Sequence, residues 1–92
     1  MTGEKITEAV ERYEKLMRDR GIKPAKLPHD VLPQNIEQQL AHISAMLPEM
    51  KEFVCQGRLE KAFRWLGFVQ GILWANQIFV LEDLKNHNRP ES

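Results

Sequence analysis

The sequence predicts an all-α protein with a short N-terminal helix, two long antiparallel helices and a short C-terminal helix, in a single domain over residues 1–92. Two observations predict this class. Apolar residues recur at steps of three and four in three separate stretches, which is the spacing of one helix face. Glycine and proline gather between these stretches, where helices start and stop. A chain of 92 residues buries a small share of its surface, so its core is marginal alone.

The first predicted helix covers residues 4–20. Thr2 or Gly3 could cap its start, and Gly21 is suited to the left-handed turn that ends a helix. A narrow apolar stripe cannot stabilise a short helix by itself, so we expect this helix to dock on the rest of the chain or on a second copy. The stripe consists of Ile6, Val10, Tyr13 and Met17.

Residues 21–33 form a stiff, extended connector, because they contain three prolines and each proline disfavours helical geometry at the preceding residue. The adjacent residues His29 and Asp30 fit a turn within it. The connector carries Lys23 and Lys26. Between residues 12 and 26 there are six basic residues and two acidic ones, so the protein has one basic corner.

The second helix is predicted from about residue 32 or 33 to Gly57, with Pro33 in its first turn. Pro48 lies within the apolar pattern, and we expect a kink there rather than a break, since the pattern continues in register. We expect Cys55, near the end of this helix, to be a packed thiol. The apolar positions are Ile36, Leu40, Ile43, Leu47, Met50 and Val54.

The third helix is predicted over residues 58–78 and has two apolar faces. An uncharged run from Trp65 to Leu81 suggests a membrane span, but it is too short, and its side-chain amides would need partners in hydrocarbon. We therefore expect a core helix. Gly67 and Gly71 would admit close helix contacts, and the second face would meet the N-terminal helix, a symmetry mate or both, which predicts a symmetric oligomer. Residues 80–88 are expected to form the last helix.

Composition excludes several classes of function. The net charge is zero, which argues against duplex nucleic acid as a partner. A single cysteine suits a reducing, intracellular compartment. The histidines lack the spacing of a metal site, and the two glycines of the third helix lack the lysine and hydroxyl residue of a phosphate-binding loop. The sequence therefore predicts a protein that is not an enzyme and has no metal or cofactor.

The basic corner suggests a binding site. An aromatic ring that stacks on a base, next to cations that bind a phosphate, is the minimal equipment for a nucleotide, and Tyr13 lies near Lys23 and Lys26 in the sequence. In the alternative interpretation Tyr13 is a core residue and the lysines are solvated. Arg64 is a further candidate, unless it only reaches the surface or pairs with Glu60.

Four motifs together resemble a known family. They are RYEKLMxxRGIKP at residues 12–24, LPxDVxPxNIExxLAH at 27–42, GRxEKAFRWLGFxQGxLW at 57–74 and LEDLKNHNRP at 81–90. The combination is similar to the small anti-CBASS proteins of tailed phages, which act as sponges for cyclic oligonucleotides. The similarity covers nearly the whole chain.

This resemblance implies a helical homohexamer in the cytoplasm of the infected bacterial host. It implies immune evasion by sequestering cyclic dinucleotides such as cGAMP and cyclic trinucleotides without cleaving them, so that CBASS effectors are not activated. Within the family, a tyrosine of the first helix and a lysine of the connector bind the dinucleotide between protomers. Tyr13 matches the first role, and Lys26, or alternatively Lys23, the second. An arginine contributes to separate trinucleotide sites, and Arg64 is the candidate.

A second interpretation is a helical protein-interaction module, such as a phage antirepressor or an inhibitor of a host protein. Such a module would use the second apolar face of the third helix. Binding of duplex DNA ranks third, because the basic corner is small and no helix-turn-helix is recognisable.

Overall fold

The computed structural model describes residues 2–89 and contains four helices in that range. They are α1 (Gly3–Asp19), α2 (Ile36–Cys55), α3 (Leu59–Ala75) and α4 (Leu81–Asn88). The all-α class is thus confirmed. The prediction that the first helix is short and the next two are long is wrong, however. Helices α1 and α3 each have 17 residues, and only α2, with 20, is longer.

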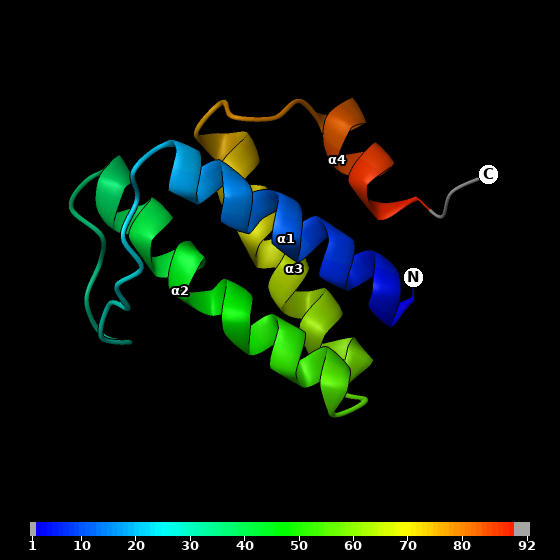
Figure 1. Cartoon of the computed structure of the whole chain (residues 1–92). Coiled ribbons are helices and arrows are strands. Elements are labelled where there is room, and N and C mark those ends of the chain that lie inside the picture. The colour runs from blue at the N-terminus through cyan, green and yellow to red at the C-terminus, as the bar shows by residue number, and fades with distance from the viewer. Residues whose placement is uncertain (1, 90–92) are drawn as a thin grey trace.

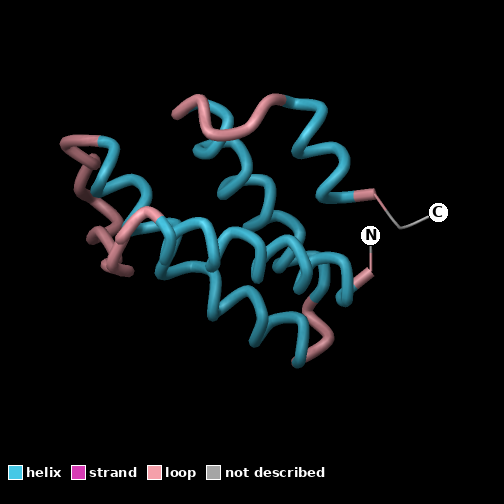
Figure 2. The backbone as a smooth tube through the Cα atoms, turned by 45° about the horizontal axis from the view of Figure 1, so that its top comes forward, coloured by secondary structure: helices cyan, strands magenta, loops and turns pink. Residues whose placement is uncertain are grey.

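Helices α1, α2 and α3 pack against one another, and α4 lies against α1 (Figure 1). The chain reverses direction between α2 and α3, which run antiparallel as predicted (Figures 1 and 2). Each of the three larger helices turns one apolar face into a shared core. The fully buried large side chains of this core are Ile6, Val10, Tyr13, Met17, Ile43, Leu47, Met50, Leu66, Val69 and Leu73.

Helix α1 begins and ends where its sequence provides caps. The Thr2 hydroxyl accepts a hydrogen bond of 3.1 Å from the backbone N–H of Lys5, which satisfies one of the free donors of the first turn. After α1, Gly21 adopts a left-handed conformation with φ of 71°, and the backbone N–H of Ile22 donates to the Met17 carbonyl. The sequence therefore placed both ends of α1 within one residue.

Helix α2 begins later than predicted. Its N-cap is Asn35, whose side chain accepts a hydrogen bond of 2.8 Å from the backbone N–H of Gln38. Pro33 therefore lies before the helix and not in its first turn, because the Asn35 cap fixes the first helical residue at Ile36, three residues after Pro33. Pro48 lies inside one uninterrupted helix, so the chain does not break there. Cys55 is exposed, contrary to the expected packed thiol.

Helix α3 buries Leu66, Val69 and Leu73, and its second apolar line is partly buried, since Trp65 and Ile72 pack against the core. A further side of the helix is exposed, where Phe63 is 48% exposed and Trp74 is 52% exposed. Gly67 and Gly71 also lie on the surface, and a Cβ atom added to either would meet no atom within 4 Å. The predicted close helix contact at these glycines is therefore absent within the chain. A contact with another copy stays a prediction.

Helix α3 ends at Ala75, three residues before the predicted end. Gln77 has a positive φ of 63°, and the backbone N–H of Ile78 donates to the Leu73 carbonyl, which is the pattern of a Schellman ending without glycine. This turn redirects the chain toward α4. Among the described helices, none combines the length and the apolar character that crossing a membrane requires.

Candidate ligand-binding site

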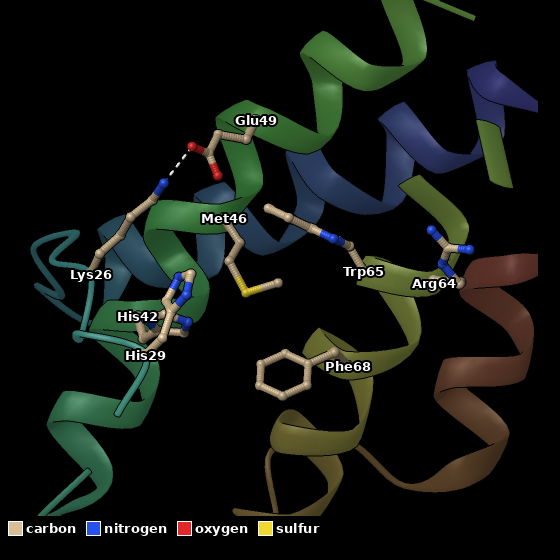
Figure 3. Close-up of a pocket in the computed structure, with 8 residues that line it drawn as sticks. All are labelled: Lys26, His29, His42, Met46, Glu49, Arg64, Trp65 and Phe68. Carbon is tan, nitrogen blue, oxygen red and sulfur yellow. Dashed lines mark hydrogen bonds and ion pairs between the residues drawn. The ribbon is translucent and has the colours of Figure 1, made fainter. Parts of the chain in front are cut away.

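A cavity of about 300 Å³ opens between the connector, α2 and α3 (Figure 3). Residues far apart in the sequence meet here because the connector returns along α2 while α3 packs beside it. The lining residues come from all three segments: Lys26, His29, His42, Met46, Glu49, Arg64, Trp65 and Phe68. The cavity therefore brings together two of the predicted ligand-binding residues, Lys26 and Arg64.

Backbone hydrogen bonds hold the connector on α2 and set the position of Lys26. The N–H of Ala25 donates to the Ala41 carbonyl at 3.1 Å, and the N–H of Leu27 donates to Nδ1 of His42 at 3.0 Å. Residues 25 and 27 thus both contact α2, as alternate residues of extended backbone do. Between them, Lys26 extends its side chain to Glu49, with which it forms an ion pair (Figure 3).

Two aromatic residues of α3, Trp65 and Phe68, form the opposite wall. Trp65 meets the Phe53 ring edge to face, with the ring centroids 4.8 Å apart. The Lys61 ammonium lies over both rings, 4.7 Å from the Phe53 centroid and 5.7 Å from that of Trp65. These contacts restrict the Trp65 ring. Phe68 is 52% exposed and lies across the cavity from the two histidines (Figure 3), so its ring is free to contact a planar ligand.

Arg64 supplies a second cation at the edge of the cavity. It is exposed, and among residues 2–89 it has no carboxylate partner within ion-pair distance. Of the two alternatives weighed from the sequence, the surface location is therefore confirmed and the pair with Glu60 is wrong. Arg64 lies beyond Trp65 as seen from Lys26 (Figure 3), so the two cations flank the aromatic wall.

Lys23 lies in a different place from Lys26. It lines a separate cavity of about 320 Å³ at the C-terminal end of α1, together with Arg20 and Glu37. The two lysines are only three positions apart in the sequence, but the hydrogen bonds of the connector orient their side chains toward different cavities. Lys23 and Lys26 therefore cannot be interchangeable ligands of one site within the chain.

Tyr13 belongs to the core and lines none of these cavities. Its side chain is fully buried, and its hydroxyl lies 2.7 Å from Nδ1 of His87 and 2.9 Å from Nε2 of Gln70. The Gln70 and Asn88 side chains exchange two further hydrogen bonds, of 2.7 and 3.0 Å. The core interpretation of Tyr13 is thus confirmed, and its ring presents no face to a ligand while α4 is docked. The stacking role stays a prediction, and it requires α4 to move.

Burial also affects the ionisation of this network. Loss of solvent raises the pKa of the Tyr13 hydroxyl, against the smaller opposing effects of the Gln70 hydrogen bond and the Arg12 charge. It lowers the pKa of His87, and the nearby positive charge of Arg12 lowers it further, whereas Asp83 acts in the opposite direction. The neutral forms of both side chains are therefore favoured, with Gln70 donating to the Tyr13 oxygen and Tyr13 donating to His87.

Sequence reasoning missed most of the cavity wall. His29 was assigned only to a turn, which is correct, and His42, Trp65 and Phe68 were not predicted as site residues. Helical spacing could have paired His42 with Glu49, because residues seven apart share a helix face. No sequence signal shows that the connector folds back beside them, so the site itself could not be assembled without the structure.

A second cavity of about 280 Å³ adjoins the first and shares His29, His42 and Phe68 with it. Its remaining wall is mainly apolar and comes from the connector, α2 and α3: Leu27, Pro28, Val31, Pro33, Gln39 and Ile72. The first cavity has two cations and one carboxylate besides its two histidines, whereas the second has no Lys, Arg, Asp or Glu side chain in its wall. Together they suit a ligand with an anionic group and flat apolar groups.

Within residues 2–89, no three His, Cys, Asp or Glu side chains are grouped so that they could hold a metal ion. The side chains of the cavity therefore offer contacts for binding: cations, ring faces, imidazole N–H groups and a carboxylate. Comparison of the chain with family models, with curated proteins and with solved structures found no match.

Proposed function

We propose that this protein binds cyclic oligonucleotide second messengers and sequesters them without cleavage. In an infected bacterial cell, such binding would keep CBASS effectors from being activated. The observation that carries the proposal is the meeting of Lys26 and Arg64 with Trp65, Phe68 and two histidines in one cavity. Cations bind phosphates, and ring faces stack on bases, so the site offers both contacts that a nucleotide needs.

The size of the site supports the same ligand class. The main cavity, at about 300 Å³, is at the lower limit of ligand pockets, which span about 300–1,000 Å³. The adjoining cavity adds about 280 Å³ along the shared Phe68 wall. A dinucleotide could place one base in each cavity and its phosphates near the cations. A role for Tyr13 and a homohexamer belong to the resemblance and are further parts of this proposal.

Titration calorimetry tests the proposal directly. The protein is titrated with a cyclic dinucleotide and with a cyclic trinucleotide, and the complex is then denatured by heat. Recovery of intact ligand by chromatography and mass spectrometry supports sequestration. Recovery of a linear or hydrolysed product would instead indicate a phosphodiesterase. No heat of binding for any ligand of either class would refute the proposal.

The exposed face of α3 favours a second candidate, a helical protein-interaction module that acts on a host protein. Two large apolar side chains on this face, Phe63 and Trp74, are 48% and 52% exposed. Helix faces of this kind dock into grooves or against other helices. In this alternative, a stoichiometric host protein is recovered with the chain, and Lys26→Ala leaves that interaction unchanged.

A further inference from the structure

Glu49 has one carboxylate oxygen whose role the fold does not explain. Its Oε1 accepts from Lys26, but its Oε2 is buried and has no hydrogen-bond partner among the described residues. In Figure 3 this second oxygen points toward Met46, another residue of the cavity wall. A buried acceptor without a donor is unfavourable, and an unpaired carboxylate oxygen more so, which calls for a ligand that donates.

His42 provides a contrasting group on the same helix face. Its Nδ1 accepts from the backbone N–H of Leu27, so in the neutral imidazole the hydrogen is carried by Nε2. His42 therefore presents a donor, whereas Glu49 presents an acceptor. The two residues are seven positions apart, about 10 Å along the helix axis. A flat heterocycle between them would need acceptors on one edge and donors on the other.

Guanine has this arrangement, and adenine does not. The N7 and O6 atoms of guanine are acceptors, and its opposite edge carries the N1–H and N2–H₂ donors, which match the two oxygens of a carboxylate. Adenine instead places its N1 lone pair beside an N6–H₂ donor on that edge, so a carboxylate would face an acceptor. The geometry points to Glu49 as a base-reading residue that makes the cavity prefer guanine-containing cyclic nucleotides. This inference rests on the proposed function.

The ion pair with Lys26 does not prevent this role. The side chains of Lys26 and Glu49 are 53% and 39% exposed, and such pairs contribute little to stability. A bound phosphate can therefore attract Lys26 away from Glu49. The carboxylate, released from its cation, then gains two donors from guanine. One ligand thus supplies a new partner to each residue: its phosphate takes the place of Glu49 beside Lys26, and its base takes the place of Lys26 beside Glu49.

Binding of three matched ligands tests the inference: cyclic di-GMP, cyclic di-AMP and cyclic di-IMP, whose hypoxanthine lacks the 2-amino group of guanine. We expect the dissociation constant to rise in the order guanine, hypoxanthine, adenine. The guanine ligand should bind about 5- to 150-fold more tightly than the adenine ligand, the discrimination of one bidentate base contact. Glu49→Gln should remove most of this preference, with weaker guanine binding and unchanged or tighter adenine binding. Glu49→Asp should weaken guanine binding by withdrawing the carboxylate.

Glu52→Gln is the matched control, since Glu52 is exposed on the next turn of α2 and lines none of the cavities described above. It should leave all three affinities unchanged, and far-ultraviolet circular dichroism verifies that each variant is folded. If the ligands bind but wild type shows no guanine preference, the inference is wrong and the proposed function stands. The same holds if Glu49→Gln tightens all three equally, because Glu49 would then only neutralise Lys26. If none of the three binds to wild type, the inference is wrong, and titrations with other cyclic dinucleotides and with cyclic trinucleotides decide the proposed function.

Discussion

The Tyr13 hydroxyl lies 2.7 Å from Nδ1 of His87, a contact between residues 74 positions apart that fastens α4 to α1. Gln70 of α3 donates to the same hydroxyl, so one oxygen joins three helices. Few apolar groups hold α4 in place, since only Leu84 and His87 of this helix are buried. The polar network is therefore a principal attachment of the C-terminal helix.

Tyr13→Phe tests the strength of this attachment. The substitution keeps the ring, which packs 5.8 Å from Phe79 between centroids, but removes the hydroxyl that joins Gln70 and His87. We expect a loss of about 1–3 kcal/mol in the free energy of unfolding, because buried polar groups lose their partner. Urea unfolding followed by circular dichroism measures it. An unchanged midpoint would show that the network contributes nothing to stability.

The stability should also depend on pH through His87. Its pKa is lowered in the folded chain, so below the ordinary value of about 6.5 the unfolded chain binds a proton first. The stability that neutral His87 contributes is fully present above that pH. It is lost as the pH falls toward the pKa that His87 has in the folded chain. Thermal unfolding between pH 8 and pH 5 should show this decline, and His87→Gln should flatten it. His29→Gln, at an exposed turn residue, is the control and should keep the wild-type profile.

Gln77→Gly should stabilise the protein. Gln77 is exposed and has a φ of 63°, a left-handed conformation that costs a residue with a side chain about 1–2 kcal/mol. Glycine avoids this strain but loses more backbone entropy, about 0.5–1 kcal/mol, so we expect a net gain of up to about 1.5 kcal/mol. The thermal midpoint reports it. Ala75→Gly at the end of α3, where no such strain exists, should lower the midpoint instead.

Lys26 and Lys23 provide a matched pair for the binding site. Lys26→Ala should weaken cyclic dinucleotide binding about 10- to 150-fold, the effect of losing a charged hydrogen bond of about 1.5–3 kcal/mol. Lys23→Ala should leave the affinity unchanged, because Lys23 lines a different cavity. Titration calorimetry measures both. A larger loss from Lys23→Ala than from Lys26→Ala would place the phosphate at the end of α1.

The exposed face of α3 predicts self-association. Sedimentation velocity at micromolar concentration should detect an oligomer of wild type, since association would remove the exposed apolar side chains from water. Phe63→Glu should shift the protein to smaller species, because Phe63 is 48% exposed and lies outside the main cavity. A wild-type monomer would contradict the prediction.

The fold was largely predictable because helical periodicity and caps are local signals. The spacing of Ile6, Val10, Tyr13 and Met17 identified the buried face of α1 correctly, and all four are buried. The start of α2 and the end of α3 were misplaced, since they depend on the Asn35 cap and on Gln77 in a conformation that favours glycine. Asparagine is a preferred N-cap, so Asn35 offered a local signal that the prediction passed over, whereas glutamine gives no signal of a left-handed turn.

The site was predictable only in part. Lys26 and Arg64 were identified as candidates from their charge and place in the sequence, and both line the main cavity. The polar contacts of Tyr13 could not be predicted, because its partners His87 and Gln70 lie on other helices and show no common pattern with it. The same is true of Glu49, whose pairing with Lys26 depends on how the connector folds back over α2.

The attachment of α4 has a consequence for the order of folding during synthesis. A chain leaves the ribosome from its N-terminus at about 5–20 residues per second, so the core residues of α1, α2 and α3, up to Leu73, emerge before His87 does. The Tyr13 hydroxyl therefore lacks its imidazole partner until the last turn of α4 has been synthesised. The contact between residues 13 and 87 is thus among the last long-range contacts of the described chain that can form.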